Sequence, residues 1–254
     1  MSEWDADDAQ LELRLRTWAV PAALLAAFVL VSTGPGRALL RIFCSMWVHE
    51  LGHAATAWLC GYLAFPGPWL TPVAAQQSLV FEVLVLAALA GGGLWAARNE
   101  QPGLARALAL VAALQLCCAG LLGEARARQL IYFMGDGGAL VLGTLLMLTV
   151  YARAGSALHR GWLRWGFLAI GAAAFADVFS LWWGARKDYD LIPFGMNEGA
   201  GLSDPSVLSD QYGWSADLLV HRYLLLGCAC LAALALAWTL GFLRARRAAA
   251  AAAC

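Results

Sequence analysis

Charged side chains are scarce in this chain of 254 residues: they make up 13% of it, against about 25% in an ordinary soluble domain. Hydrophobic residues make up 61%, and the mean hydropathy is +0.66. This excess of apolar residues excludes an ordinary soluble enzyme, and it also excludes a disordered chain. Because 17 basic and 17 acidic residues cancel, no nucleic acid or other polyanion is expected as a partner.

Three other features are missing from the sequence. None of the seven cysteines forms a CxxC pair of the kind that binds zinc, so they are expected to act as small apolar side chains. No internal repeat of the kind found in many transporters is present. Residues 1–12 hold five acidic side chains where a secretory signal would be positively charged, so residues 1–17 are interpreted as an acidic N-terminal tail.

Long apolar runs predict an all-α fold, a polytopic transmembrane helix bundle over residues 18–243 with a C-terminal tail over 244–254. Each run reaches or approaches the roughly 20 residues with which a helix crosses about 30 Å of hydrocarbon. The runs do not alternate apolar and polar residues as the strands of a membrane barrel would. The seven predicted spans cover residues 18–33, 38–62, 79–97, 104–123, 130–151, 162–184 and 217–243.

Two connections between these spans differ from ordinary short loops. Residues 63–78 contain Pro66, Pro68 and Pro72 and no charge, so they cannot form a continuous helix, yet they are apolar enough to lie at the membrane surface or to re-enter it. Residues 185–216 form the longest loop, which is acidic and carries four aromatic side chains. A loop of this length is often functional, so it is either a lid or partner surface, or a solvated connector.

The motif that indicates chemistry is His-Glu-Leu-Gly-His at residues 49–53, an HExxH motif. On a helix, His49 and His53 share one face about 6 Å apart, so both imidazoles can bind one Zn²⁺ ion. Glu50 points about 100° away around the helix, where it can take a proton from water at the metal. Ionisable groups in an apolar stretch are costly, which favours a metal site over a packing cluster.

A catalytic zinc usually has three protein ligands, so a third must come from elsewhere in the chain. Asp136 is the predicted third ligand, because it is a lone carboxylate in an apolar span among glycines that permit close approach or a bend. Asp177, in the middle of the sixth predicted span, is an alternative ligand or a partner of a ligating histidine. Glu124 is a further alternative, although its arginine neighbours favour a solvated ion pair.

On these residues the chain resembles the site-2 protease family of intramembrane zinc metalloproteases. The motif at 49–53 is similar to that family's zinc motif in a transmembrane helix, and Asp136-Gly137-Gly138 is similar to its Asp-Gly motif at the start of a later core helix. The resemblance covers residues 38–151. The family usually carries Asn and Pro ahead of that Asp, and residues 131–135 contain neither.

The resemblance implies that His49, His53 and Asp136 hold zinc and that Glu50 activates water. The predicted function is therefore hydrolysis of peptide bonds in membrane-anchored proteins. Three alternatives stay open: a non-proteolytic relative that retains the metal site, a transporter-like bundle that uses its acidic and histidine side chains as a polar path, and a membrane HExxH peptidase whose third ligand is a glutamate. The expected partners are a membrane-protein substrate and the lipid bilayer, with zinc as the cofactor.

The composition also indicates a source. The sequence is rich in Ala, Gly and Arg and has a single Lys, as in GC-rich bacterial coding sequences. The predicted location is thus the bacterial inner membrane, crossed several times.

Overall fold

The computed structural model describes residues 3–152, 162–197 and 201–252. The chain divides into two compact units. The first comprises Met1–Val48, Asp136–Pro193 and Ser215–Cys254, and the second comprises His49–Gly135 and Phe194–Trp214. Most of the described residues are helical, and the two strands named among them form one short ribbon, so the predicted all-α class is confirmed.

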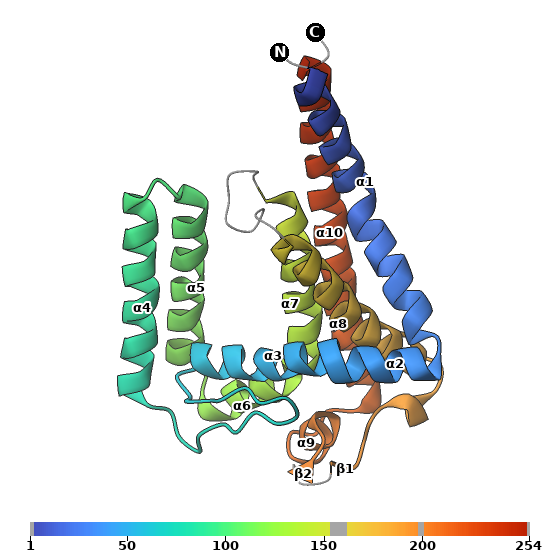
Figure 1. The fold of residues 1–254 in the computed structure, drawn as a ribbon. Helices are drawn as coiled ribbons and strands as arrows, with labels where there is room; N and C mark the ends of the chain where they lie inside the picture. The colour runs from blue at the N-terminus through green and yellow to red at the C-terminus, as the bar shows by residue number, and fades with distance from the viewer. Residues whose placement is uncertain (1–2, 153–161, 198–200, 253–254) are drawn as a thin grey trace. The chain divides into compact units, whose positions relative to one another are not determined.

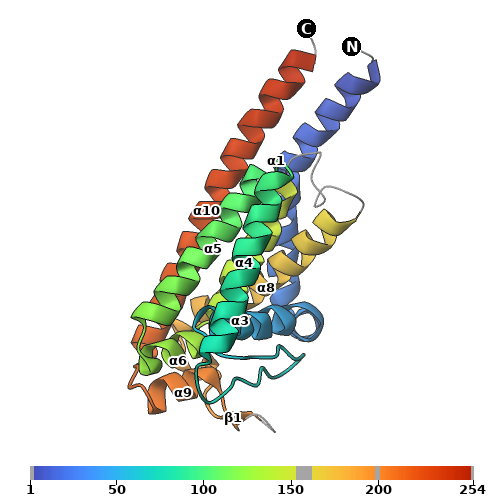
Figure 2. The same ribbon diagram turned by 90° about the vertical axis from the view of Figure 1, so that its left-hand side faces the viewer.

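The first unit is built from long apolar helices that pack along one another (Figures 1 and 2). They are α1 (Glu3–Val31), α7 (Asp136–Leu148), α8 (Leu163–Ala185) and α10 (Ala216–Ala252). Helices α7 and α8 approach closely where Gly143 faces Gly171. A Cβ on Gly171 would lie only 2.5 Å from the carbonyl oxygen of Gly143, so the approach requires glycine at this position. Small residues at such crossings are typical of helix packing in membranes.

Shorter elements complete the first unit. They are α2 (Gly34–Leu40), the π-helical turn η1 (Arg41–Ser45), and the 3₁₀ turns η2 (Thr149–Tyr151) and η4 (Tyr189–Leu191). Helix α3 (Met46–Leu59) begins in this unit and continues into the second. The acidic N-terminal segment and the C-terminal tail are both helical where described, as the ends of α1 and α10.

The second unit contains most of α3 and an antiparallel helix pair, α4 (Leu79–Arg98) and α5 (Pro102–Leu121), which lie side by side in Figures 1 and 2. It also holds α6 (Glu124–Phe133), α9 (Asp204–Asp210) and the ribbon of β1 (Met196–Asn197) with β2 (Gly201–Leu202). Ala54 and Ala57 of α3 pack in a buried cluster with Ala127 and Ile131 of α6. This packing holds the HExxH helix beside α6.

Residues 61–78 form no helix, as the prolines predict. Instead the segment doubles back on itself, with Ala64 bridged to Val73 and with the backbone N–H of Ala74 donating to the carbonyl of Leu63. Aromatic side chains near its tip, Phe65 and Trp69, are exposed.

The predicted seven spans are not confirmed. Among the described residues, five helices are long and apolar enough to cross a membrane, which indicates a membrane protein; they cover Gln10–Val31, Leu79–Arg98, Pro102–Leu121, Leu163–Ala185 and Ala216–Arg247. A sixth results if α6 and α7 together form one broken span. The predicted span at 38–62 is not among them, because η1 interrupts its helix and it carries Arg41 and the ionisable HExxH residues.

Candidate metal centre

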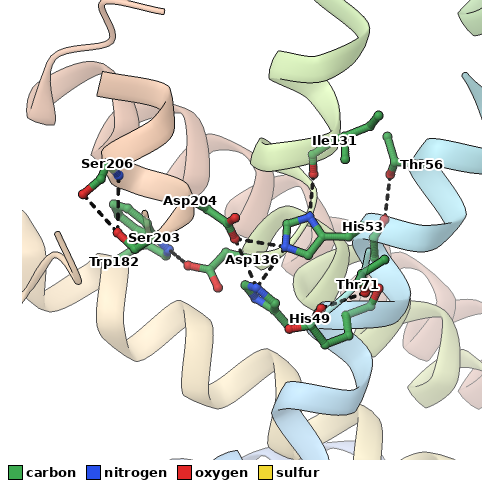
Figure 3. A network of polar contacts seen from close by, with 12 residues as sticks. His49, His53, Thr56, Thr71, Ile131, Asp136, Trp182, Ser203, Asp204 and Ser206 are labelled. Atoms are coloured by element: carbon green, nitrogen blue, oxygen red, sulfur yellow. Dashed lines mark hydrogen bonds and ion pairs between the residues drawn. The ribbon is translucent and has the colours of Figure 1, made fainter. Parts of the chain in front are cut away.

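Three side chains of the second unit bring potential metal ligands together: His49, His53 and Asp204, here called the His/His/Asp group. The Nε2 atoms of the two imidazoles lie 3.1 Å apart, and the Asp204 Oδ2 atom lies 3.1 Å from His49 Nε2 and 3.0 Å from His53 Nε2. Figure 3 shows the two rings and the carboxylate pointing toward one another. The spacing of the histidines in the sequence therefore does place both rings at one point.

The hydrogen bond at the far side of the His53 ring determines which nitrogen is available to a metal. His53 Nδ1 lies 2.7 Å from the backbone oxygen of Ile131, and a carbonyl oxygen only accepts, so Nδ1–H is the donor. In the neutral ring, Nε2 then carries a lone pair directed at the other two ligand atoms. Metal-binding histidines usually have such a partner on the second nitrogen, which fixes both the tautomer and the ring orientation.

The end of α6 makes this hydrogen bond possible. The helix stops at Phe133, and the next residues bend the chain, so Gly135 N–H bonds to the Tyr132 carbonyl rather than to Ile131. The last carbonyls of a helix lack a partner four residues on. The Ile131 oxygen accepts a hydrogen bond from the Met134 N–H three residues on, at 3.2 Å, so its second lone pair is open to the imidazole. The break in the helix and the orientation of His53 are consequently linked.

Asp204 begins α9, which places its carboxylate at a defined point of the longest loop. Ser203 caps the helix by accepting a hydrogen bond from the backbone of Ser206, and Pro205 occupies the first turn, where its missing N–H is harmless. The Ser206 hydroxyl in turn accepts a hydrogen bond from the Gly195 backbone at 2.8 Å. These contacts hold the first turn of α9 in place.

The electrostatics of Asp204 favour its ionised form. Burial opposes ionisation of the carboxyl group, but the positive charge and hydrogen bonds of the adjacent His53 and His49 rings, when these are protonated, outweigh this effect and hold the pKa of Asp204 well below its usual range. The carboxylate is thus available as an anionic ligand.

The donor set and its spacing both fit a tetrahedral metal ion. Ligand atoms at about 2.0–2.1 Å from such an ion stand about 3.3 Å apart, close to the distances within the His/His/Asp group. With neutral rings, the lone pairs of His53 Nε2 and the Asp204 carboxylate would face each other at 3.0 Å, and a shared cation in place of the ring proton removes their repulsion. Two imidazoles with one carboxylate are ligands that Zn²⁺ accepts, with a fourth position left for water or substrate.

Comparisons with family models, curated proteins and solved structures found no match. The candidate metal centre therefore rests on the geometry of the His/His/Asp group alone.

Gly135 provides the space in which the ligand atoms meet. A Cβ at this position would lie 2.5 Å from His53 Nε2, 2.6 Å from His49 Cε1 and 2.7 Å from Asp204 Oδ2. Atoms do not approach this closely without displacement, so any larger residue would push the ligands apart. This glycine was visible in the sequence only as one of several that permit a bend.

We expect Gly135→Ala to lower the affinity for Zn²⁺ by at least about 10-fold, because the ligand spacing fits the ion only without a Cβ. The measurement is competition with a chromophoric chelator on detergent-purified protein. Gly120→Ala in α5 is the matched control, since a Cβ there meets nothing within 4 Å. An unchanged affinity in Gly135→Ala would show that the ion is not held at this group.

Asp136, the predicted third ligand, is not part of the His/His/Asp group, where Asp204 supplies the carboxylate. Its Oδ2 atom accepts a hydrogen bond of 2.8 Å from Trp182 Nε1 within the first unit, and the Trp182 ring stacks on Tyr223. Asp136 as a metal ligand stays a prediction, and the carboxylate that sequence reasoning missed is Asp204. In the sequence, Asp204 is one of five acidic residues in the loop 185–216, and only its Ser-Asp-Pro-Ser setting distinguishes it as the start of a helix.

The other two acidic candidates also have partners of their own. Asp177 is buried in α8, with Oδ2 3.9 Å from Arg41 Nη1 of η1, and is not part of the His/His/Asp group. Glu124 is exposed at the start of α6 and pairs with Arg128 one turn later, at 3.3 Å, so its predicted ion pair is confirmed. Among the described residues, no glutamate belongs to the His/His/Asp group.

Glu50 lies on α3 next to the first histidine and is buried, with 4% of its surface exposed. Its carboxylate Oε2 accepts a hydrogen bond of 2.7 Å from the Thr71 hydroxyl. Helix α3 thus carries two potential metal ligands and a buried carboxylate, and the carboxylate is held by a second segment of the chain.

Proposed function

We propose that this chain is an intramembrane zinc metalloprotease similar to the site-2 protease family, which hydrolyses peptide bonds of membrane-anchored proteins. The observation that carries the proposal is the meeting of His49, His53 and Asp204 at one point, together with the buried Glu50 that follows His49 on the same helix. A purely structural site needs ligands but has no need of a buried glutamate next to a ligand. Five apolar helices in the same chain support a substrate in or beside the bilayer.

In this mechanism the chain's own residues supply binding and proton transfer. His49, His53 and Asp204 would hold Zn²⁺, which as a Lewis acid polarises a carbonyl and makes water acidic. Glu50 accepts a proton from the attacking water on its carboxylate and returns it to the nitrogen of the leaving amine. The Ile131 carbonyl keeps His53 in the tautomer that binds metal.

The substrate class follows from the same setting. The carbonyl groups of a transmembrane helix are satisfied within the helix, so a peptide bond becomes accessible only where the substrate is locally unwound. An extended or weakly helical segment of a membrane-anchored protein is therefore the proposed substrate.

Metal removal tests this function. We expect detergent-purified protein to contain about one zinc per chain and to release peptides from fluorescein-labelled casein, an unfolded substrate. Treatment with 1,10-phenanthroline should stop the release, and added Zn²⁺ should restore it. His53→Ala should lose the metal, whereas His221→Ala, an exposed histidine outside the His/His/Asp group, should retain it.

The results separate the proposal from its alternatives. Bound zinc without hydrolysis of any substrate would support a non-proteolytic relative that keeps the metal site. A chain with no stoichiometric zinc that transports solutes into vesicles would instead support the transporter-like bundle.

A further inference from the structure

Residues 65–72, at the tip of the doubled-back segment, are mostly exposed, and Thr71 is the one buried residue among them. It is buried, with 9% of its surface exposed, whereas its neighbours Leu70 and Pro72 are exposed. The doubled-back course of residues 61–78 turns this one hydroxyl toward α3. A buried hydroxyl requires a hydrogen-bond partner, and the partner here is Glu50.

The contact between Thr71 and Glu50 involves two oxygens. Thr71 Oγ1 lies 2.7 Å from the carboxylate Oε2 and 2.9 Å from the backbone oxygen of Glu50, so a single hydrogen is shared between them. Among the described residues, Thr71 is the source of the hydrogen bond to this carboxylate. One carboxylate oxygen is thereby tethered, and the other is left to accept a proton.

A glutamate side chain has three rotatable bonds, and an untethered one would sample several positions. Proton transfer requires the carboxylate to lie within hydrogen-bond reach of the water. A displacement of about 1 Å can lower a rate 100-fold. A fixed hydroxyl bonded to one carboxylate oxygen restricts this freedom, and Thr71 is not itself one of the potential metal ligands.

We infer that Thr71 is a positioning residue for the general base, holding the Glu50 carboxylate through its hydroxyl. The inference rests on the proposed function, because it assigns Thr71 a role in the same site. Thr71 acts through Glu50, so its loss should slow the chemical step and leave metal binding and substrate affinity in place.

The test compares Thr71→Val, which keeps the shape and removes the hydroxyl, with Thr71→Ser, which keeps the hydroxyl. On labelled casein we expect Thr71→Val to lower kcat by about 10- to 100-fold with KM within about twofold and zinc content unchanged. Thr71→Ser should recover kcat to within a few-fold of the original chain. A structural role would move KM, zinc content or thermal stability in parallel, and an unchanged kcat in Thr71→Val would overturn the inference.

A second readout does not require hydrolysis. Acetohydroxamate binds zinc as an anion, so a neighbouring base must take its proton. Glu50→Gln, which lacks that base, is the reference variant. We expect Thr71→Val to weaken acetohydroxamate binding by about 10-fold and Thr71→Ser to preserve it. If the zinc-loaded chain cleaves nothing but shows this pattern, the proteolytic function fails and the role of Thr71 stands. The role of Thr71 would be overturned if the original chain, Thr71→Val and Thr71→Ser bound acetohydroxamate with equal affinity. It would also be overturned if the original chain bound neither zinc nor acetohydroxamate.

Discussion

Glu50→Gln is expected to abolish peptide hydrolysis while leaving zinc in place. The glutamine amide has nearly the shape of the carboxylate and can still accept the hydrogen bond from Thr71, but it cannot take up a proton. Removal of a general base lowers a rate by about 10²–10⁴-fold. The measurement is release of peptides from labelled casein, with zinc content determined on the same sample by elemental analysis.

The matched control for this variant is Glu124→Gln. Glu124 is exposed and pairs with Arg128 within α6, where such a pair contributes less than about 1 kcal/mol. Its replacement should leave both hydrolysis and zinc content unchanged. If Glu50→Gln cleaves casein at the rate of the original chain, Glu50 is not the general base. The site would then have no feature that distinguishes it from a structural metal site.

Asp204→Ala is expected to lower zinc affinity by more than about 100-fold, a larger effect than loss of a partner outside the ligand set. The reason is that Asp204 supplies the only anionic atom of the His/His/Asp group in the described residues. Competition with a chelator measures the affinity directly. Asp210→Ala, at the exposed end of the same short helix, is the control and should bind zinc as the original chain does.

The same experiment distinguishes the two candidate aspartates. Asp136→Asn keeps an acceptor for the Trp182 indole and removes the negative charge, so we expect it to fold and to retain zinc. If Asp136→Asn loses zinc and Asp204→Ala does not, then Asp136 is the third ligand, as the sequence predicts. In that case the His/His/Asp group does not hold the ion.

The histidines and the glutamate of the site could be predicted from the sequence because their relation is local. A separation of four residues on a helix places His49 and His53 on one face whatever the rest of the chain does. Asp204 could not be predicted in this way, since its position depends on how α9 packs against α6. The same holds for Thr71, whose burial results from the tertiary course of a segment that composition describes only as non-helical.

The candidate membrane spans also differ in how well the sequence predicts them. Runs made almost wholly of apolar residues, such as those of α4 and α5, were predicted nearly to the residue, because hydropathy and length decide them. The run at 38–62 contains the ionisable side chains of the site and a π-helical turn. Its hydropathy alone therefore does not predict whether it forms one continuous spanning helix. Prediction thus failed where polar chemistry interrupts an apolar sequence.

The wide separation in sequence between His53 and Asp204 has a consequence for biosynthesis. A growing chain carries both imidazoles and Glu50 well before it carries the residue that completes the ion-binding set, and metal binding requires that set to be assembled. An incomplete chain would therefore remain inert while it emerges from the ribosome and inserts. For the proposed protease, this delay would protect its own unfolded segments, and neighbouring nascent proteins, from premature cleavage.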